Sequence, residues 1–212
     1  MYWELLPELP LSHRNGKTYL APAEAYDPEK KWNVEPVELY AVFPFRLFGF
    51  AKENYDLILD TFYSAIKEGG QDRPFSIGET PGASSYSGWQ SVGTCAALLG
   101  LSEKCGEILS QNCALTNPGT RFPAMWGPIY DAVPDVDHGA NILTQLQTMV
   151  MQVEGSKIYI LPAFPDKWNV SFRLYADKDT VVEASYRDGK LKDVSVEPKI
   201  RQKDLVLLKE EG

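Results

Sequence analysis

The clearest hydrophobic periodicity in the chain lies between Gly139 and Val153 and predicts a long α-helix. The apolar residues of this segment fall on one face at a period of 3.6: Ile142, Leu143, Leu146, Met149, Val150 and Val153. The opposite face is polar but carries no charge: Asn141, Thr144, Gln145, Gln147, Thr148 and Gln152. A helix face in water normally carries Lys and Glu, so this pattern indicates a helix packed on both sides. Asp137 occupies the expected N-cap position.

Four earlier segments read as helices that differ in surface charge. Segments 37–50 and 89–100 are almost uncharged, whereas 51–68 and 103–115 carry charged residues on one face. Pro44 is expected to kink or split the first of these. Together with segment 139–153, uncharged and charged helices alternate along the chain. This alternation is expected for two concentric layers, in which the inner helices are surrounded by protein and the outer helices face water on one side. The expected fold is mainly α: a partial (α/α)6 toroid of alternating inner and outer helices.

The residues after Gly155 change to a period of two, which indicates strands. Five runs fit: KIYILPAFP, VSFRLYAD, TVVEASYR, KLKDVSVE and DLVLL. Asp188-Gly189 joins two of them in a predicted hairpin turn. The sequence thus predicts a helical region over residues 1–155 and a small antiparallel β-sheet module over 156–212. Five prolines predict that residues 1–36 are irregular, with YLAPAEAYD a short strand or turn.

Composition narrows the functional classes. The net charge of −8 argues against nucleic acid and anionic membranes as partners. No apolar run approaches a membrane span, and the first residues do not resemble a signal peptide, so we expect a soluble chain of unknown location. Three cysteines are an odd number, and free, buried thiols are favoured over a Cys95–Cys105 pair. No zinc-type spacing occurs, and we expect neither metal nor cofactor.

The first candidate site precedes the 139–153 helix, where Asp135, Asp137 and His138 follow a loop containing Trp126. A carboxylate at a helix N-terminus is kept ionised by the helix dipole, which suits a general base that activates water. Asp137 and Asp135 are both candidates for this base. The simpler alternative is that Asp137 only caps the helix.

Two further groups stand at the starts of uncharged segments. Asn33 and Glu35 precede the first, Glu38 lies in its first turn, and Trp89 and Gln90 begin the second. Capping and packing are the simpler explanations. In a toroid these ends would converge on one face of the cavity. Acids, amides and aromatics without a nucleophile, phosphate loop or metal cluster point to carbohydrate chemistry, which needs two acids and a water.

Several motifs resemble the C-terminal half of (α/α)6-barrel glycoside hydrolases related to family 95, the inverting α-L-fucosidases and α-L-galactosidases, and look closest to relatives in carbohydrate-degrading bacteria. The resemblance rests on NVEPVELYAVFPFRLFG, GWQ followed by AALLGL, WGPIYDAVPDVDHG and LQTMVMQVEGSKIYILPAFPDKW. It implies that Asp137 is the general base. The chain departs from the family in reading Asp137-His138-Gly139 where fucosidases have Asp-Gly-Asn, and in lacking an upstream Ser-Pro-Glu-like motif that would carry the general acid.

The leading hypothesis is therefore a glycoside hydrolase, or the C-terminal part of one, that acts by inversion on a carbohydrate substrate. Asp137 or Asp135 would be catalytic, and six residues would line the sugar subsite: His138, Trp126, Trp89, Gln90, Asn33 and Glu35. Glu35, Glu38 and Glu24 are the candidates for a replacement acid. The alternatives are a non-catalytic carbohydrate-binding or interaction protein and a purely structural remnant. A half barrel would expose an apolar edge, so self-association or association with the missing half is expected.

Overall fold

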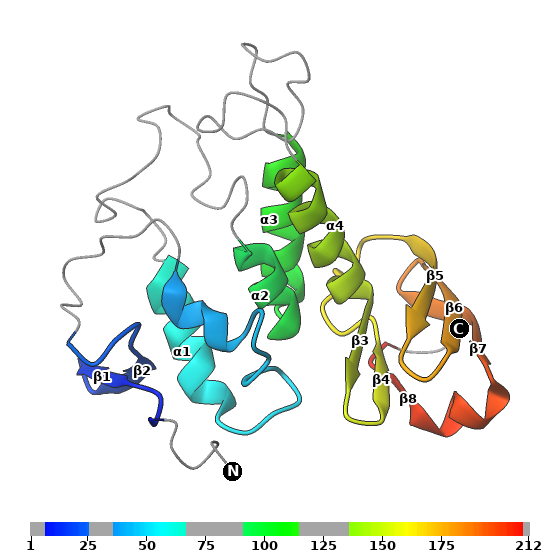
Figure 1. Ribbon diagram of the computed structural model, residues 1–212. Coiled ribbons are helices and arrows are strands. Elements are labelled where there is room, and N and C mark those ends of the chain that lie inside the picture. The colour runs from blue at the N-terminus through cyan, green and yellow to red at the C-terminus, as the bar shows by residue number, and fades with distance from the viewer. Residues whose placement is uncertain (1–6, 26–35, 67–90, 115–135, 210–212) are drawn as a thin grey trace.

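The computed structural model describes residues 7–25, 36–66, 91–114 and 136–209, which form helices at the centre and strands at both ends (Figure 1). The α-helices of these ranges are α1 (Tyr55–Ile66), α2 (Val92–Leu98), α3 (Ser102–Ala114) and α4 (Val136–Val150). Two 3-10 helices accompany them, η2 (Val37–Ala41) and η3 (Lys199–Asp204). The strands are β1 (Leu11–Arg14), β2 (Lys17–Leu20), β3 (Met151–Glu154), β4 (Lys157–Ile160), β5 (Val170–Ala176), β6 (Thr180–Arg187), β7 (Lys190–Glu197) and β8 (Leu205–Leu207).

The strands form three small sheets. The first is the antiparallel hairpin β1–β2. The second has the order β3-β4-β8, in which β8 pairs parallel to β4. The third is the antiparallel meander β5-β6-β7. All five strands predicted after Gly155 are present, and the predicted Asp188-Gly189 turn joins β6 to β7 with both residues at positive φ. The prediction of one antiparallel sheet is wrong, because β4 and β8 pair parallel in a separate sheet with β3.

The expected mainly α, partial (α/α)6 toroid is wrong. Within the described ranges, strands in three sheets accompany only four α-helices. The expected first inner helix, 37–50, is helical only as the short η2. Helix α1 packs chiefly on strand β2 and η2, and α4 runs directly into strand β3. Hydrophobic periodicity identified most helices but did not determine what packs against them: α1 packs on a strand, whereas α2, α3 and α4 pack on one another.

The 37–50 segment leaves helical geometry where its backbone finds other partners. The peptide between Phe43 and Pro44 is cis, and Arg46 has a positive φ of 54°. The N–H groups of Leu47 and Phe48 both donate to the carbonyl of Ala41, at 2.8 and 3.2 Å. These bonds close a tight loop after η2, so Pro44 ends the helix rather than kinking it.

Helix α4 was also extended too far by its sequence pattern. The prediction continued it to Val153, but the chain from Met151 to Glu154 pairs with β4 in the register Met151↔Ile160. The predicted apolar stripe holds for Met149 and Val150, which are buried, whereas Leu143 is 59% exposed. The hairpin β3–β4 spans the predicted boundary at residue 155, and that division into regions stays a prediction.

The core is continuous from the helices into the sheets. All seven residues of α2 are buried, which confirms that its lack of charge reflects protein on every side. The apolar stripe of α1 is buried at Ile58, Phe62 and Ile66, as its amphipathic pattern predicted. Buried side chains of β4 and β6, such as Ile158 and Val182, belong to the same cluster. The helical part therefore needs the strands to complete its core.

Candidate functional site

The predicted catalytic residue Asp137 lies at the N-terminal end of α4. The helix begins at Val136, so Asp137 and His138 belong to its first turn, whereas the sequence placed Asp137 at the N-cap. The N–H groups of a first turn lack intrahelical acceptors, and the helix dipole stabilises negative charge there. The backbone position therefore suits an ionised carboxylate.

The other predicted site residues lie outside the described ranges, and so the structure does not place them relative to α4. They are Asp135, Trp126, Trp89, Gln90, Asn33 and Glu35. Of the other acids considered as a replacement for the general acid, Glu24 is exposed near the end of the first described range, and Glu38 is half-buried in η2. The predicted convergence of these residues on one face was a consequence of the toroid and loses that support.

The body of α4 is held by two buried glutamines that the sequence analysis assigned only to an uncharged face. Gln145 is 2% exposed and donates from Nε2 to the backbone carbonyl of Cys105 in α3, at 2.9 Å. It reaches this carbonyl by crossing α2 at Gly93, where a Cβ would lie 2.0 Å from its Oε1. A glycine at position 93 is therefore required for the close approach of the Gln145 side chain to the backbone of α2.

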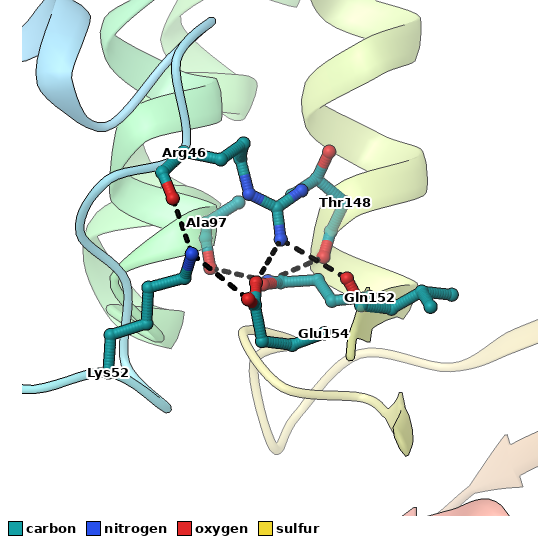
Figure 2. Close-up of polar contacts among 7 residues, drawn as sticks. Arg46, Lys52, Ala97, Thr148, Gln152 and Glu154 are labelled. Carbon is teal, nitrogen blue, oxygen red and sulfur yellow. Dashed lines mark hydrogen bonds and ion pairs between the residues drawn. The ribbon is translucent and has the colours of Figure 1, made fainter. Parts of the chain in front are cut away.

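The second glutamine, Gln152, fastens the start of β3 to the end of α2. Its Nε2 donates to the carbonyl of Ala97 at 2.7 Å and to the carbonyl of Thr148 at 3.0 Å (Figure 2). Ala97 is in the last turn of α2, where carbonyls lack intrahelical donors, so the amide helps to satisfy the helix end. Gly100, with a φ of +73°, completes that end as a C-terminal glycine.

A cluster of three charged side chains joins the loop after η2 to the hairpin β3–β4. Glu154 accepts from Arg46 Nη2 at 3.2 Å through Oε2 and from Lys52 Nζ at 2.9 Å through Oε1 (Figure 2). Lys52 also donates to the carbonyl of Arg46, and Arg46 donates to the carbonyl of Val153. Both carboxylate oxygens are thus engaged with cations, which makes Glu154 a structural anchor rather than a proton donor.

The cysteines offer no nucleophile in the interior. Cys95 and Cys105 are free and buried, as predicted, and burial raises the pKa of Cys95 to about 12. Burial raises the pKa of Cys105 as well. Since the thiolate is the reactive form, these two groups behave as apolar side chains at neutral pH. The prediction was wrong for Cys113, which is exposed.

The described residues contain neither a metal-binding cluster nor a membrane-spanning helix. Among the side chains described in residues 7–25, 36–66, 91–114 and 139–209, no three His, Cys, Asp or Glu residues gather in an arrangement that could hold a metal ion. Across the same ranges, no helix has both the length and the apolar character to cross a membrane.

No protein-family model matches the sequence, and no curated protein matches it. The resemblance to family 95 glycoside hydrolases therefore remains an expectation from the motifs.

Proposed function

We propose that this chain is a glycoside hydrolase, or the C-terminal part of one, in which Asp137 is the base that activates water for inverting hydrolysis. The observation that carries the proposal is the position of Asp137 in the first turn of α4. The helix dipole there favours the carboxylate form that a general base requires. The motifs around α4 supply the substrate class, since they resemble those of the inverting α-L-fucosidase group.

The anchoring of α4 supports this role. A general base must be held within hydrogen-bond reach of the attacking water, and small displacements reduce the rate strongly. Gln145, Met149 and Gln152 fix the middle and end of the helix against α2 and α3 through buried contacts. The N-terminal turn therefore belongs to a helix whose middle and end are packed in the core.

A carbohydrate-binding protein without hydrolytic activity is the second candidate. It is favoured by the engagement of Glu154, the carboxylate closest in sequence to α4 on its C-terminal side, with Arg46 and Lys52. Inverting hydrolysis needs a general acid as well as a base. In this candidate Asp137 would only accept a hydrogen bond from a sugar hydroxyl.

A substrate that needs no general acid separates the two candidates. Fluoride leaves a glycosyl fluoride without protonation by a strong acid, so a chain that holds only the base can still hydrolyse it. We expect the wild-type chain to release fluoride from α-L-fucosyl or α-L-galactosyl fluoride and the Asp137→Asn variant to be inactive. Saccharide binding without fluoride release would favour the second candidate.

A further inference from the structure

The sheet β5-β6-β7, at the C-terminal end of the molecule (Figure 1), has one face in the core and one in water. Inward-facing residues of β6 such as Val182, Ala184 and Tyr186 are buried. Antiparallel sheets commonly have such a solvated face, and polar residues there need no special explanation. The exception on this face is Tyr175 on the edge strand β5, which is 75% exposed.

The strand register places polar groups next to this ring. Tyr175 lies opposite Val181, and in the next row Arg173 lies opposite Glu183, which in turn lies opposite Ser195. Arg173 Nε and Glu183 Oε1 are 3.1 Å apart, so two planar groups are already oriented. Neighbouring strands are about 4.8 Å apart and alternate residues about 6.8 Å apart, so the ring, guanidinium and carboxylate lie within the reach of one small ligand.

A β-bulge adds a second polar pair to the same face. The register between β6 and β7 shifts between Glu183 and Ser185, and Asp193 takes a positive φ of 53°. Its Oδ2 accepts a hydrogen bond from Ser185 Oγ at 3.1 Å. Bulges redirect side chains, and a residue other than glycine at positive φ costs about 1–3 kcal/mol, so this carboxylate is held over the face at the expense of local stability.

The charges on the face favour a neutral ligand. Its outward residues carry both signs, interspersed from strand to strand: Arg173, Arg187, Lys190 and Lys192 against Glu183, Asp193 and Glu197. Such a surface has no strong potential of either sign, and therefore does not select nucleic acid or another polyanion. An exposed ring beside oriented charged and hydroxyl groups suits a ligand with one apolar face and many hydroxyls.

We propose that this face is a saccharide-binding surface, distinct from the N-terminal end of α4. A sugar ring stacks on Tyr175, and its hydroxyls bond to the Arg173–Glu183 pair in the next row. The Ser185–Asp193 pair lies two rows from Tyr175, about 14 Å along the strands, and bonds a neighbouring sugar unit of an oligosaccharide. The choice of a saccharide as the ligand rests on the proposed function. The location of the surface rests on the sheet alone.

Affinity electrophoresis of the full chain tests the proposal with four soluble polysaccharides: fucosylated xyloglucan, galactomannan and arabinoxylan as neutral probes, and polygalacturonate as an anionic one. We expect retardation by at least one neutral probe, and at least a tenfold loss of affinity in Tyr175→Ala. The matched control is Tyr63→Ala, since Tyr63 is an exposed tyrosine on α1 at 45%. It should bind as the wild type does.

Three results would overturn the proposal: equal affinity of Tyr175→Ala and wild type, retardation by polygalacturonate alone, or no retardation by any of the four probes. The fluoride-release assay separates these failures from failure of the proposed function. Loss of fluoride release in Asp137→Asn together with unchanged binding in Tyr175→Ala would retain the hydrolase and remove the second site. Unchanged fluoride release in Asp137→Asn together with lost binding in Tyr175→Ala would retain the saccharide-binding surface and remove Asp137 as the hydrolytic base.

Discussion

The side chain of Gln145 in α4 crosses α2 directly over Gly93, so that a Cβ on Gly93 would lie 2.0 Å from its Oε1 and 2.3 Å from its Cδ. The amide continues beyond this crossing to the carbonyl of Cys105 in α3. Three helices are thus fixed by one glycine and one glutamine, both buried. This contact holds the helix whose first turn contains Asp137.

Replacing Gly93 by alanine should lower the free energy of unfolding by about 2–3 kcal/mol, because the new methyl group must displace a buried, hydrogen-bonded side chain. Urea denaturation followed by circular dichroism measures the change. The matched control is Gly139→Ala in α4, where a Cβ meets nothing within 4 Å. That variant should be as stable as the wild type or up to about 1 kcal/mol more stable, because alanine favours the helix.

The crossing itself is tested by adding Gln145→Ala, which removes the obstructing amide. In that background Gly93→Ala should cost much less than it does alone, giving a coupling free energy above about 1 kcal/mol. Additive effects of the two substitutions would show that Gly93 is needed for some reason other than the passage of Gln145.

Arg201, in the 3-10 helix η3, should be the most sensitive charged position in the C-terminal part of the chain. Its side chain is 7% exposed and pairs with Asp177 at 3.1 Å and Asp204 at 2.7 Å, while Nη1 donates to Thr180 Oγ1. Removing one partner of a buried ionic network costs about 3–5 kcal/mol, so Arg201→Ala should lose stability in that range. Thermal and urea unfolding measure it.

Arg173→Ala is the control for Arg201. The Arg173–Glu183 pair is exposed, at 64% and 48% of the two side chains, and exposed pairs contribute about 0–1 kcal/mol. A similar loss in both variants would mean that burial of the Arg201 network does not determine its contribution.

The three thiols should react in two classes. Cys113 is exposed, although partial burial raises its pKa, whereas Cys95 and Cys105 are buried and their pKa values are raised further. At pH 8 we expect one equivalent of a disulfide reagent to react rapidly and two only on unfolding. Raising the pH should accelerate the fast phase because the thiolate fraction of Cys113 increases. Cys113→Ser should abolish that phase, and three equal rates would contradict the buried positions.

Local sequence signals predicted the strands after Gly155, because the turn residues between them favour the backbone angles that a tight hairpin requires. Asp188-Gly189 fixes both positive φ angles of a two-residue hairpin, and the alternation on either side selects the face. The same signal was missed at Asn15-Gly16, which joins β1 to β2 with φ values of 51° and 75°. The nearby prolines predicted an irregular chain, although Asn-Gly is as strong a hairpin signal as Asp-Gly.

The helices show that hydrophobic periodicity does not identify the packing partners of a helix. The absence of charge correctly indicated burial for α2, but α4 is buried at Gln145 and exposed at Leu143 and Gln147. The pattern also could not distinguish an inner layer of a toroid from a helix covered by other neighbours. Gln145 and Gln152 are uncharged because each satisfies a carbonyl of a neighbouring helix. Those partners are 40 and 55 residues away in sequence, so no local pattern identifies them. For the candidate site, the structure supplies only the backbone position of Asp137 and His138.

The most direct test of the account is fluoride release from α-L-fucosyl and α-L-galactosyl fluoride by wild type, Asp137→Asn and Asp56→Asn. Asp56 is the matched control, because it is an exposed acid at the second residue of α1, as Asp137 is at the second residue of α4. We predict release by wild type and Asp56→Asn, and a loss of at least a hundredfold in Asp137→Asn with unchanged unfolding. Equal release by Asp137→Asn and wild type, or no release by wild type, would contradict Asp137 as the hydrolytic base.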